Sequence, residues 1–165
     1  MRGWLLDTNI VSELRKPKPA KAVTEFVAAQ PGELLFITEV TFGEIRYGIE
    51  QLEDSARRAD INLWLDSTLR PLFSGRVLAI TEDVVVRWKT MIVDGRKRGH
   101  TFGQPDLFIA AMAALEDLVV VTRDTPSSLP PACRHLILGR VCSMPGARNF
   151  KSLRRRRRKL LPRLS

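Results

Sequence analysis

The chain has 165 residues, of which 44% are apolar and 7% aromatic; this suits one globular domain with its own core and excludes a largely disordered chain. Its apolar runs fall far short of the roughly twenty residues that cross a bilayer, so we expect no transmembrane helix and no membrane partner. The formal net charge of +9 by itself suggests a nucleic-acid partner.

The net positive charge of the chain comes entirely from its last quarter. Residues 1–124 contain 16 basic and 18 acidic residues, a net charge of −2, whereas residues 125–165 contain 11 basic and no acidic ones, a net charge of +11. Such a difference indicates two kinds of sequence. We expect residues 1–124 to form the main body of the domain, 125–139 a divergent end of the same domain, and 140–165 a basic, disordered tail.

The first residues favour a cytoplasmic protein. Asp7 follows Trp4 and its apolar neighbours too closely to leave room for the apolar stretch of a signal peptide. In a reducing compartment the two cysteines, Cys133 and Cys142, need no disulfide.

The first part of the body predicts strands at 4–6 and 34–38, with helical spacing at 8–15, from 22 to about 30, and from 41 onward. Pro17 and Pro19 end the first of these helices. Thr41, with Glu44 three residues later, has the form of a capping box that would open the third.

The second part predicts one helix over 52–73, a strand over 77–80, a helix from about 82 to 98, a helix over 107–115 and a strand over 118–122. Pro71 and Gly75 would end the first helix, and Thr81 or Asp83 would cap the second. Alternating strands and helices predict an α/β fold, in which a central parallel sheet is flanked by helices in a Rossmann-like three-layer arrangement.

Four acidic residues fall where such a fold places its ligands. Asp7 and Asp124 follow strands, and in parallel sheets ligands collect at the carboxyl ends of strands. Glu44 and Asp106 lie near the starts of predicted helices. With right-handed crossovers, all four carboxylates would face one crevice.

Clustered carboxylates raise each other's pKa unless a cation compensates. Mg²⁺ and Mn²⁺ prefer such oxygen ligands, and in phosphodiester cleavage they activate a water and stabilise the departing oxygen. Thr8 and Asn9 are placed to orient Asp7, and Thr122 could add a hydroxyl. A simpler interpretation stays open for each acid alone: Asp7 as a helix cap, and Glu44 and Asp106 as ordinary first-turn acids.

Four segments together resemble the PIN-domain ribonucleases, and among them the VapC-type, especially FitB-like, toxins of type II toxin–antitoxin modules. They are Leu5–Leu14, Val40–Ile49, Asp106–Ala111 and Val121–Asp124, and the likeness covers about residues 3–124. It implies a PIN-like fold and a Mg²⁺-dependent or Mn²⁺-dependent endoribonuclease. It also implies catalytic roles for Asp7, Glu44, Asp106 and Asp124, with Asp7 and Asp106 as metal ligands.

The same resemblance implies an RNA substrate, a homodimer, and a cognate antitoxin through which alone operator DNA would be bound. An apolar surface around Val23, Phe26, Phe36 and Trp64 could receive an antitoxin helix, although core packing also explains these residues. One alternative is a catalytically weak PIN-like module that holds an antitoxin and nucleic acid in a regulatory complex; the intact acids argue against it. Another, a phospho-accepting receiver domain, lacks the expected central-strand Asp and partner Lys.

The resemblance stops after Asp124. The family usually ends in a strand near Asn/Asp-Pro-Trp, which is absent here. One hypothesis is a frameshift, because codons exist for residues 132–139 whose neighbouring frame reads Gly-Val-Pro-Thr-Phe-Asp-Pro-Trp. It predicts a poor last strand or none, and sequencing the gene tests it. The competing hypothesis is that the basic run at 154–159 binds phosphates non-specifically.

Overall fold

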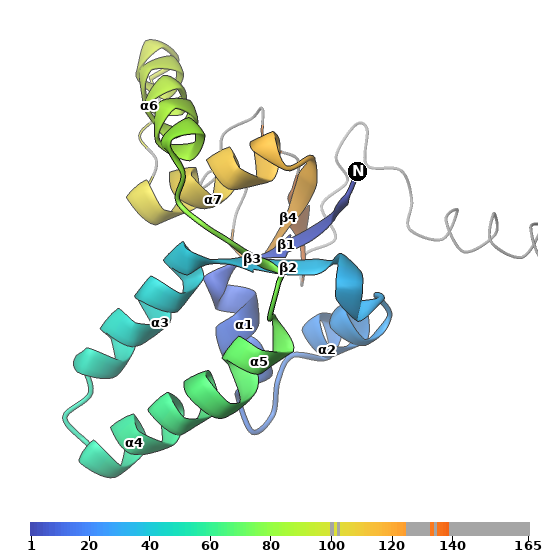
Figure 1. Ribbon diagram of the computed structural model, residues 1–165, viewed down its shortest axis with the longest axis vertical. Coiled ribbons are helices and arrows are strands. Elements are labelled where there is room, and N and C mark those ends of the chain that lie inside the picture. The colour runs from blue at the N-terminus through green and yellow to red at the C-terminus, as the bar shows by residue number, and fades with distance from the viewer. Residues whose placement is uncertain (100, 102, 125–132, 134, 139–165) are drawn as a thin grey trace, which may run out of the picture.

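The computed structural model describes residues 1–99, 101, 103–124, 133 and 135–138. Its strands form one parallel sheet in the order β3-β2-β1-β4-β5. They are β1 (Gly3–Leu6), β2 (Leu35–Thr38), β3 (Val77–Leu78), β4 (Leu118–Thr122) and β5 (His135–Ile137). In Figure 1, α6 (Glu82–Lys97) and α7 (Gln104–Leu115) cover one face, and α1 (Thr8–Leu14), α2 (Lys21–Ala28) and α5 (Arg70–Leu72) lie on the other. This confirms the predicted three-layer α/β fold.

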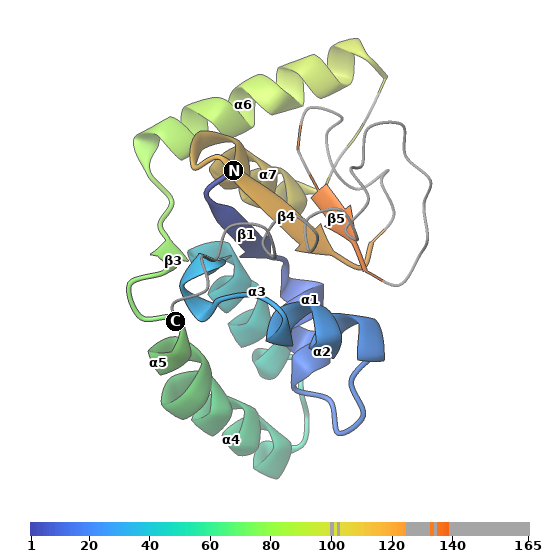
Figure 2. The ribbon, with the colours of Figure 1, turned by 90° about the vertical axis from the view of Figure 1, so that its right-hand side faces the viewer.

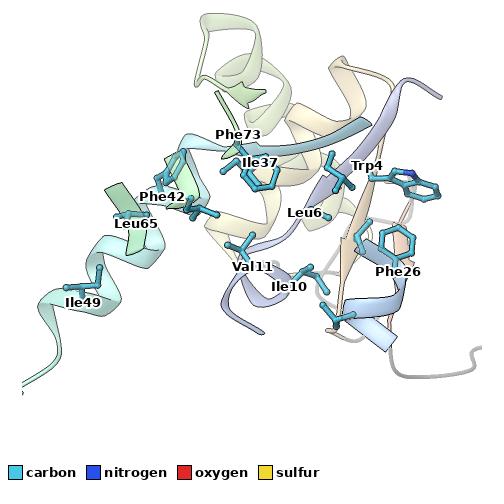
Figure 3. Packing of buried hydrophobic residues seen from close by; sticks show 14 residues of the cluster. Trp4, Leu6, Ile10, Val11, Phe26, Ile37, Phe42, Ile49, Leu65 and Phe73 are labelled. Atoms are coloured by element: carbon cyan, nitrogen blue, oxygen red, sulfur yellow. The ribbon is translucent and has the colours of Figure 1, made fainter. Parts of the chain in front are cut away.

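Alternate side chains of β1 enter two separate cores, because successive residues of a strand point to opposite faces. Trp4 and Leu6 join the core beneath α1 and α2, where the Trp4 ring meets Phe26 edge-on at 5.2 Å (Figure 3). Leu5 joins the core beneath α6 and α7. Burial on both faces explains why the strand is a continuous apolar run instead of an alternating one.

Helix α3 (Glu39–Glu50) begins before Thr41, the residue that was predicted to cap it. Its cap is Thr38, the last residue of β2, whose hydroxyl accepts a hydrogen bond from the Thr41 N–H at 3.0 Å. The prediction that Thr41 opens this helix was therefore wrong. The helix begins directly after the strand, and Glu44 lies in the second turn of the helix.

The single helix predicted over 52–73 is divided. It comprises α4 (Ser55–Trp64), a π-helical segment η2 (Leu65–Leu69) and α5. Pro71 lies inside the last turn and has no N–H for the α-helical pattern, and its ring would crowd the carbonyl four residues earlier. The wider π turn just before it accommodates the ring. The chain then turns at Gly75, whose φ of +72° favours glycine.

The other boundaries differ by only a few residues. A 3-10 turn, η1 (Gly32–Leu34), precedes β2. β3 stops two residues short of its predicted end, and Thr81, not Asp83, caps α6. Within the described part of the chain, no helix has both the length and the apolar character needed to cross a membrane.

A short strand occupies the edge where a poor last strand or none was expected. β5 pairs in parallel with β4, in the register Val121 to Leu136 (Figure 2). The predictions about residues 140–165 lie outside the described residues.

Candidate active site

The strand order explains how acids far apart in sequence meet. β1 lies between β2 and β4, so the residues that follow these three parallel strands share one edge of the sheet. Asp7 follows β1, α3 with Glu44 follows β2, and Asp124 lies two residues beyond β4. Asp106 lies in the first turn of α7, the helix that leads into β4.

Asp7 is 8% exposed and accepts three hydrogen bonds. The Thr8 N–H donates to Oδ1 at 2.7 Å, whereas the Asn9 amide and the Thr122 hydroxyl donate to Oδ2 at 2.8 and 2.7 Å. A carboxylate has about four acceptor positions, so one position remains, on Oδ1. Asp7 also caps α1, so the simpler interpretation of this residue is correct as far as it goes.

The three predicted supporting residues are all in contact with the acids. The Thr8 hydroxyl donates to Oε2 of Glu44 and thereby links the start of α1 to α3. The Thr122 hydroxyl, which donates to Asp7, also accepts hydrogen bonds from the Asn9 amide at 2.9 Å and the Asp124 N–H at 3.0 Å. One donor and two acceptor positions are all that a hydroxyl has. Thr122 therefore orients the acids and has no position left to bind a metal itself.

Asp106 is the acid most strongly affected by its neighbours. Its pKa is raised from 3.8 to about 6, first by partial burial and then by the charges of Asp7, Glu44 and Asp124. The pKa of Asp7 is raised as well, mainly by burial, although the hydrogen bonds from Thr122 and Thr8 oppose this. The four carboxylates thus act on one another electrostatically, which an isolated helix acid would not show.

The donor set suits a hard divalent cation. A cation relieves exactly this kind of repulsion, and carboxylate oxygens are its preferred ligands. Within the described part of the chain, no three or more acidic, histidine or cysteine side chains are arranged to hold a metal ion by themselves. An ion held by the free position of Asp7 and by Asp106 would therefore keep several waters, as Mg²⁺ commonly does.

A cleft of about 250 Å³ opens beside Glu44, between α1, α3 and α4. Its walls include Thr8 and Glu44 at one end and Arg15, Arg57 and Trp64 further along. Of the four residues predicted to form an apolar docking surface, Val23, Phe26 and Phe36 are buried in the two cores, as the core-packing alternative predicted. Trp64 alone of the four lines this cleft.

Two residues near the site had no role assigned from the sequence, Glu13 and Arg123. Glu13 is buried, with 4% of its surface exposed, and it pairs with Arg123, which immediately precedes Asp124. A signal was present, because Glu13 lies four residues after Asn9 and so on the same face of α1. Its partner, 110 residues away, had no local signal.

The fold and the acidic site define a PIN-domain protein. A family model for the PIN domain matches residues 4–126, and the chain belongs to this family. The predicted family resemblance is confirmed.

Among the known proteins similar to this chain are a VapC ribonuclease, Y4jK, from Sinorhizobium fredii, and the toxin FitB from Neisseria gonorrhoeae. The first is 33% identical over 121 residues, covering 73% of this chain and 86% of the relative. The second is 31% identical over 123 residues, covering 74% and 88%. The crystal structure of FitAcB from Neisseria gonorrhoeae contains a similar chain, with a TM-score of 0.70 and 31% identity over 75% of this chain and 89% of that one.

Proposed function

We propose that this chain is the toxin of a toxin–antitoxin system and acts as a Mg²⁺-dependent or Mn²⁺-dependent endoribonuclease. The observation that carries the proposal is the meeting of four carboxylates at one sheet edge, where partial burial and then the charges of the other three acids raise the pKa of Asp106 to about 6. Family membership and the ribonucleases among the relatives support the same activity. Intact acids that act on one another electrostatically favour an enzyme over a catalytically weak module.

In this proposal Asp7 and Asp106 hold the cation, while Glu44 and Asp124 complete the negative site. A bound divalent ion lowers the pKa of a water and stabilises the departing oxygen in phosphodiester cleavage. Asp7 is held by its three hydrogen bonds, so its free Oδ1 position is already oriented before the ion arrives. Thr8 does the same for Glu44.

RNA would lie along the cleft beside Glu44. Arg57, on the wall of this cleft, has no ion-pair partner among the described residues, and a free guanidinium binds a phosphate well. Arg15 on the same wall is paired with Asp60 and lies over the Trp64 ring. Within residues 1–124, which are slightly acidic overall, attraction for RNA would thus come from the cleft and the cation.

The test is cleavage of a single-stranded RNA pool by the purified full chain. We expect cleavage with Mg²⁺ or Mn²⁺, none with excess EDTA, and recovery when the cation is restored. Cleavage that persists in EDTA would contradict metal dependence. No cleavage under any cation would contradict the nuclease assignment.

We further propose a cognate antitoxin, a homodimer, and operator DNA binding only through that antitoxin. Similar solved structures include FitAB bound to a DNA fragment, with a TM-score of 0.75 and 27% identity. An antitoxin segment that occupied the cleft beside Glu44 would block RNA. Co-purification with the neighbouring gene product should therefore suppress cleavage, and light scattering of the toxin alone should give the mass of two chains. Retained activity in the complex would contradict the inhibitory role.

A further inference from the structure

We propose that Glu13 is a positioning residue of the active site, which holds Asp124 in place through Arg123. The inference rests on the proposed nuclease function and adds a residue to it. Glu13 lies outside the acidic quartet. Its carboxylate binds Arg123 and thereby anchors the segment that carries Asp124.

The Glu13 carboxylate is almost completely enclosed and has three partners. Its Oε1 accepts a hydrogen bond from the Ala20 N–H at 2.9 Å, and its Oε2 accepts from Lys16 at 2.6 Å and from the Arg123 guanidinium. These partners hold the pKa of Glu13 below its ordinary value, first through the hydrogen bond from Lys16 and then through that from Ala20. Glu13 therefore stays charged throughout the neutral range.

Two residues of helix α1 bind Arg123. Asn9 accepts a hydrogen bond from the Arg123 N–H at 3.1 Å, and Glu13, one helical turn later, binds the Arg123 guanidinium. The next residue is Asp124, whose own N–H is held by Thr122 at 3.0 Å. Both backbone N–H groups of the turn after β4 are thus fixed, and the Glu13–Arg123 pair fixes the side chain between them.

The anchor matters because none of the described residues supports the side chain of Asp124. Its carboxyl group is exposed and accepts no hydrogen bond from the described residues, yet its charge acts on both Asp7 and Asp106. Among the described residues, Asp124 is therefore positioned through its backbone, which Thr122 holds at Asp124 and which Asn9 and Glu13 hold at Arg123. Misplacing a catalytic group by about 1 Å can cost on the order of a hundredfold in rate.

Lys16 supplies a matched control. It binds the same oxygen of Glu13 as Arg123 does, but it belongs to the loop after α1, and among the described residues its ammonium group makes no hydrogen bond or ion pair with the four acids. If Glu13 only stabilised this part of the fold, loss of Lys16 and loss of Arg123 would have similar consequences. If Glu13 positions Asp124, only loss of Arg123 should affect the site.

The experiment compares Glu13→Gln, Arg123→Met and the control Lys16→Met in the full chain. Cleavage of RNA gives kcat and KM, and calorimetry without RNA gives the Mn²⁺ dissociation constant. We expect Glu13→Gln and Arg123→Met to lower kcat about tenfold and to weaken Mn²⁺ binding severalfold, with KM within about twofold. Lys16→Met should leave all three values within about twofold. In an Asp124→Asn background, Glu13→Gln should cause no further loss.

Several outcomes would overturn the proposal. One is equal behaviour of Arg123→Met and Lys16→Met, and another is a full additional loss from Glu13→Gln in the Asp124→Asn background. If Glu13→Gln does not fold, Arg123→Met decides, because Glu13 then keeps Lys16 and Ala20. If the wild type binds Mn²⁺ but cleaves no RNA, the nuclease proposal fails while the Mn²⁺ affinities still test the anchor. If the wild type binds no Mn²⁺, both fail.

Discussion

Replacing Asp106 by asparagine should lower RNA cleavage by about 10²- to 10³-fold and, at the same time, make the metal-free protein more stable at pH 8. The loss of rate follows from the loss of a metal ligand, since stabilisation of transition-state charge by an ion is worth several kcal/mol. The gain in stability follows from the removal of a charge that the folded protein tolerates poorly.

The sign of the stability effect comes from the pKa of Asp106, which is raised from 3.8 to about 6 in the folded chain. The folded state holds the proton more tightly than the unfolded state, so wild-type stability is lost as the pH rises from about 4 to about 6. Two pKa units correspond to about 3 kcal/mol, and partial exposure reduces this to about 1–2 kcal/mol. Asp106→Asn should therefore gain that amount above pH 6 and almost nothing below pH 4.

Thermal unfolding of the metal-free protein at pH 4 and pH 8 measures this difference. Asp83→Asn is the matched control, because Asp83 also lies in the first turn of a helix but outside the acidic site. It should not gain stability with pH. Adding Mg²⁺ should reverse the order, since the wild type binds the ion more tightly than the variant. A metal-free Asp106→Asn protein that is less stable than the wild type at pH 8 would contradict the clustered-charge interpretation.

Thr122→Val should have the opposite effect on stability: we expect a loss of about 2 kcal/mol, together with at least a tenfold loss of cleavage. Valine has nearly the same shape as threonine, but it lacks the hydroxyl that serves Asp7, Asn9 and Asp124. The Asp124 N–H and one N–H of the Asn9 amide would lose their acceptor, and a buried donor left unpaired costs about 1–3 kcal/mol. Asp7 would lose a donor that lowers its pKa.

Denaturant unfolding and RNA cleavage measure both effects. Thr122→Ser keeps the hydroxyl and should retain most of the activity. Thr90→Val is the control for loss of a threonine hydroxyl at an exposed position, where the hydroxyl only bonds the Val86 carbonyl in its own helix. It should change stability by less than about 0.5 kcal/mol. A stable, active Thr122→Val protein would show that Asp7, Asn9 and Asp124 do not depend on this hydroxyl.

The periodicity of apolar residues was sufficient to predict the main elements, because burial dominates their formation. β1 and β4 are continuous apolar runs, and each lies inside the sheet as such runs require. The errors occurred where a single side chain or carbonyl decides the boundary. Thr38, not Thr41, caps α3. A π-helical segment, which has no periodic signature in the sequence, precedes Pro71.

The candidate site was predictable as a set of acids, because carboxylates that follow strands or open helices occupy recognisable places in an α/β chain. Their roles were not, because each acid alone is also an ordinary capping or first-turn residue. Asp7 shows both at once, since it caps α1 and interacts electrostatically with Glu44, Asp106 and Asp124. Only their mutual effect on Asp106 separates a site from four independent acids.

By itself, the sequence determined the succession of strands and helices along the chain, the family resemblance and the identity of the four acids. Each of these can be recognised from residues that lie close together in the sequence. The tertiary structure alone decided how these acids are held. Thr122 reaches Asp7 across 115 residues, and Arg123 reaches Glu13 across 110. Hydrogen bonds between segments so far apart leave no local pattern, because their geometry exists only after β1 and β4 have paired.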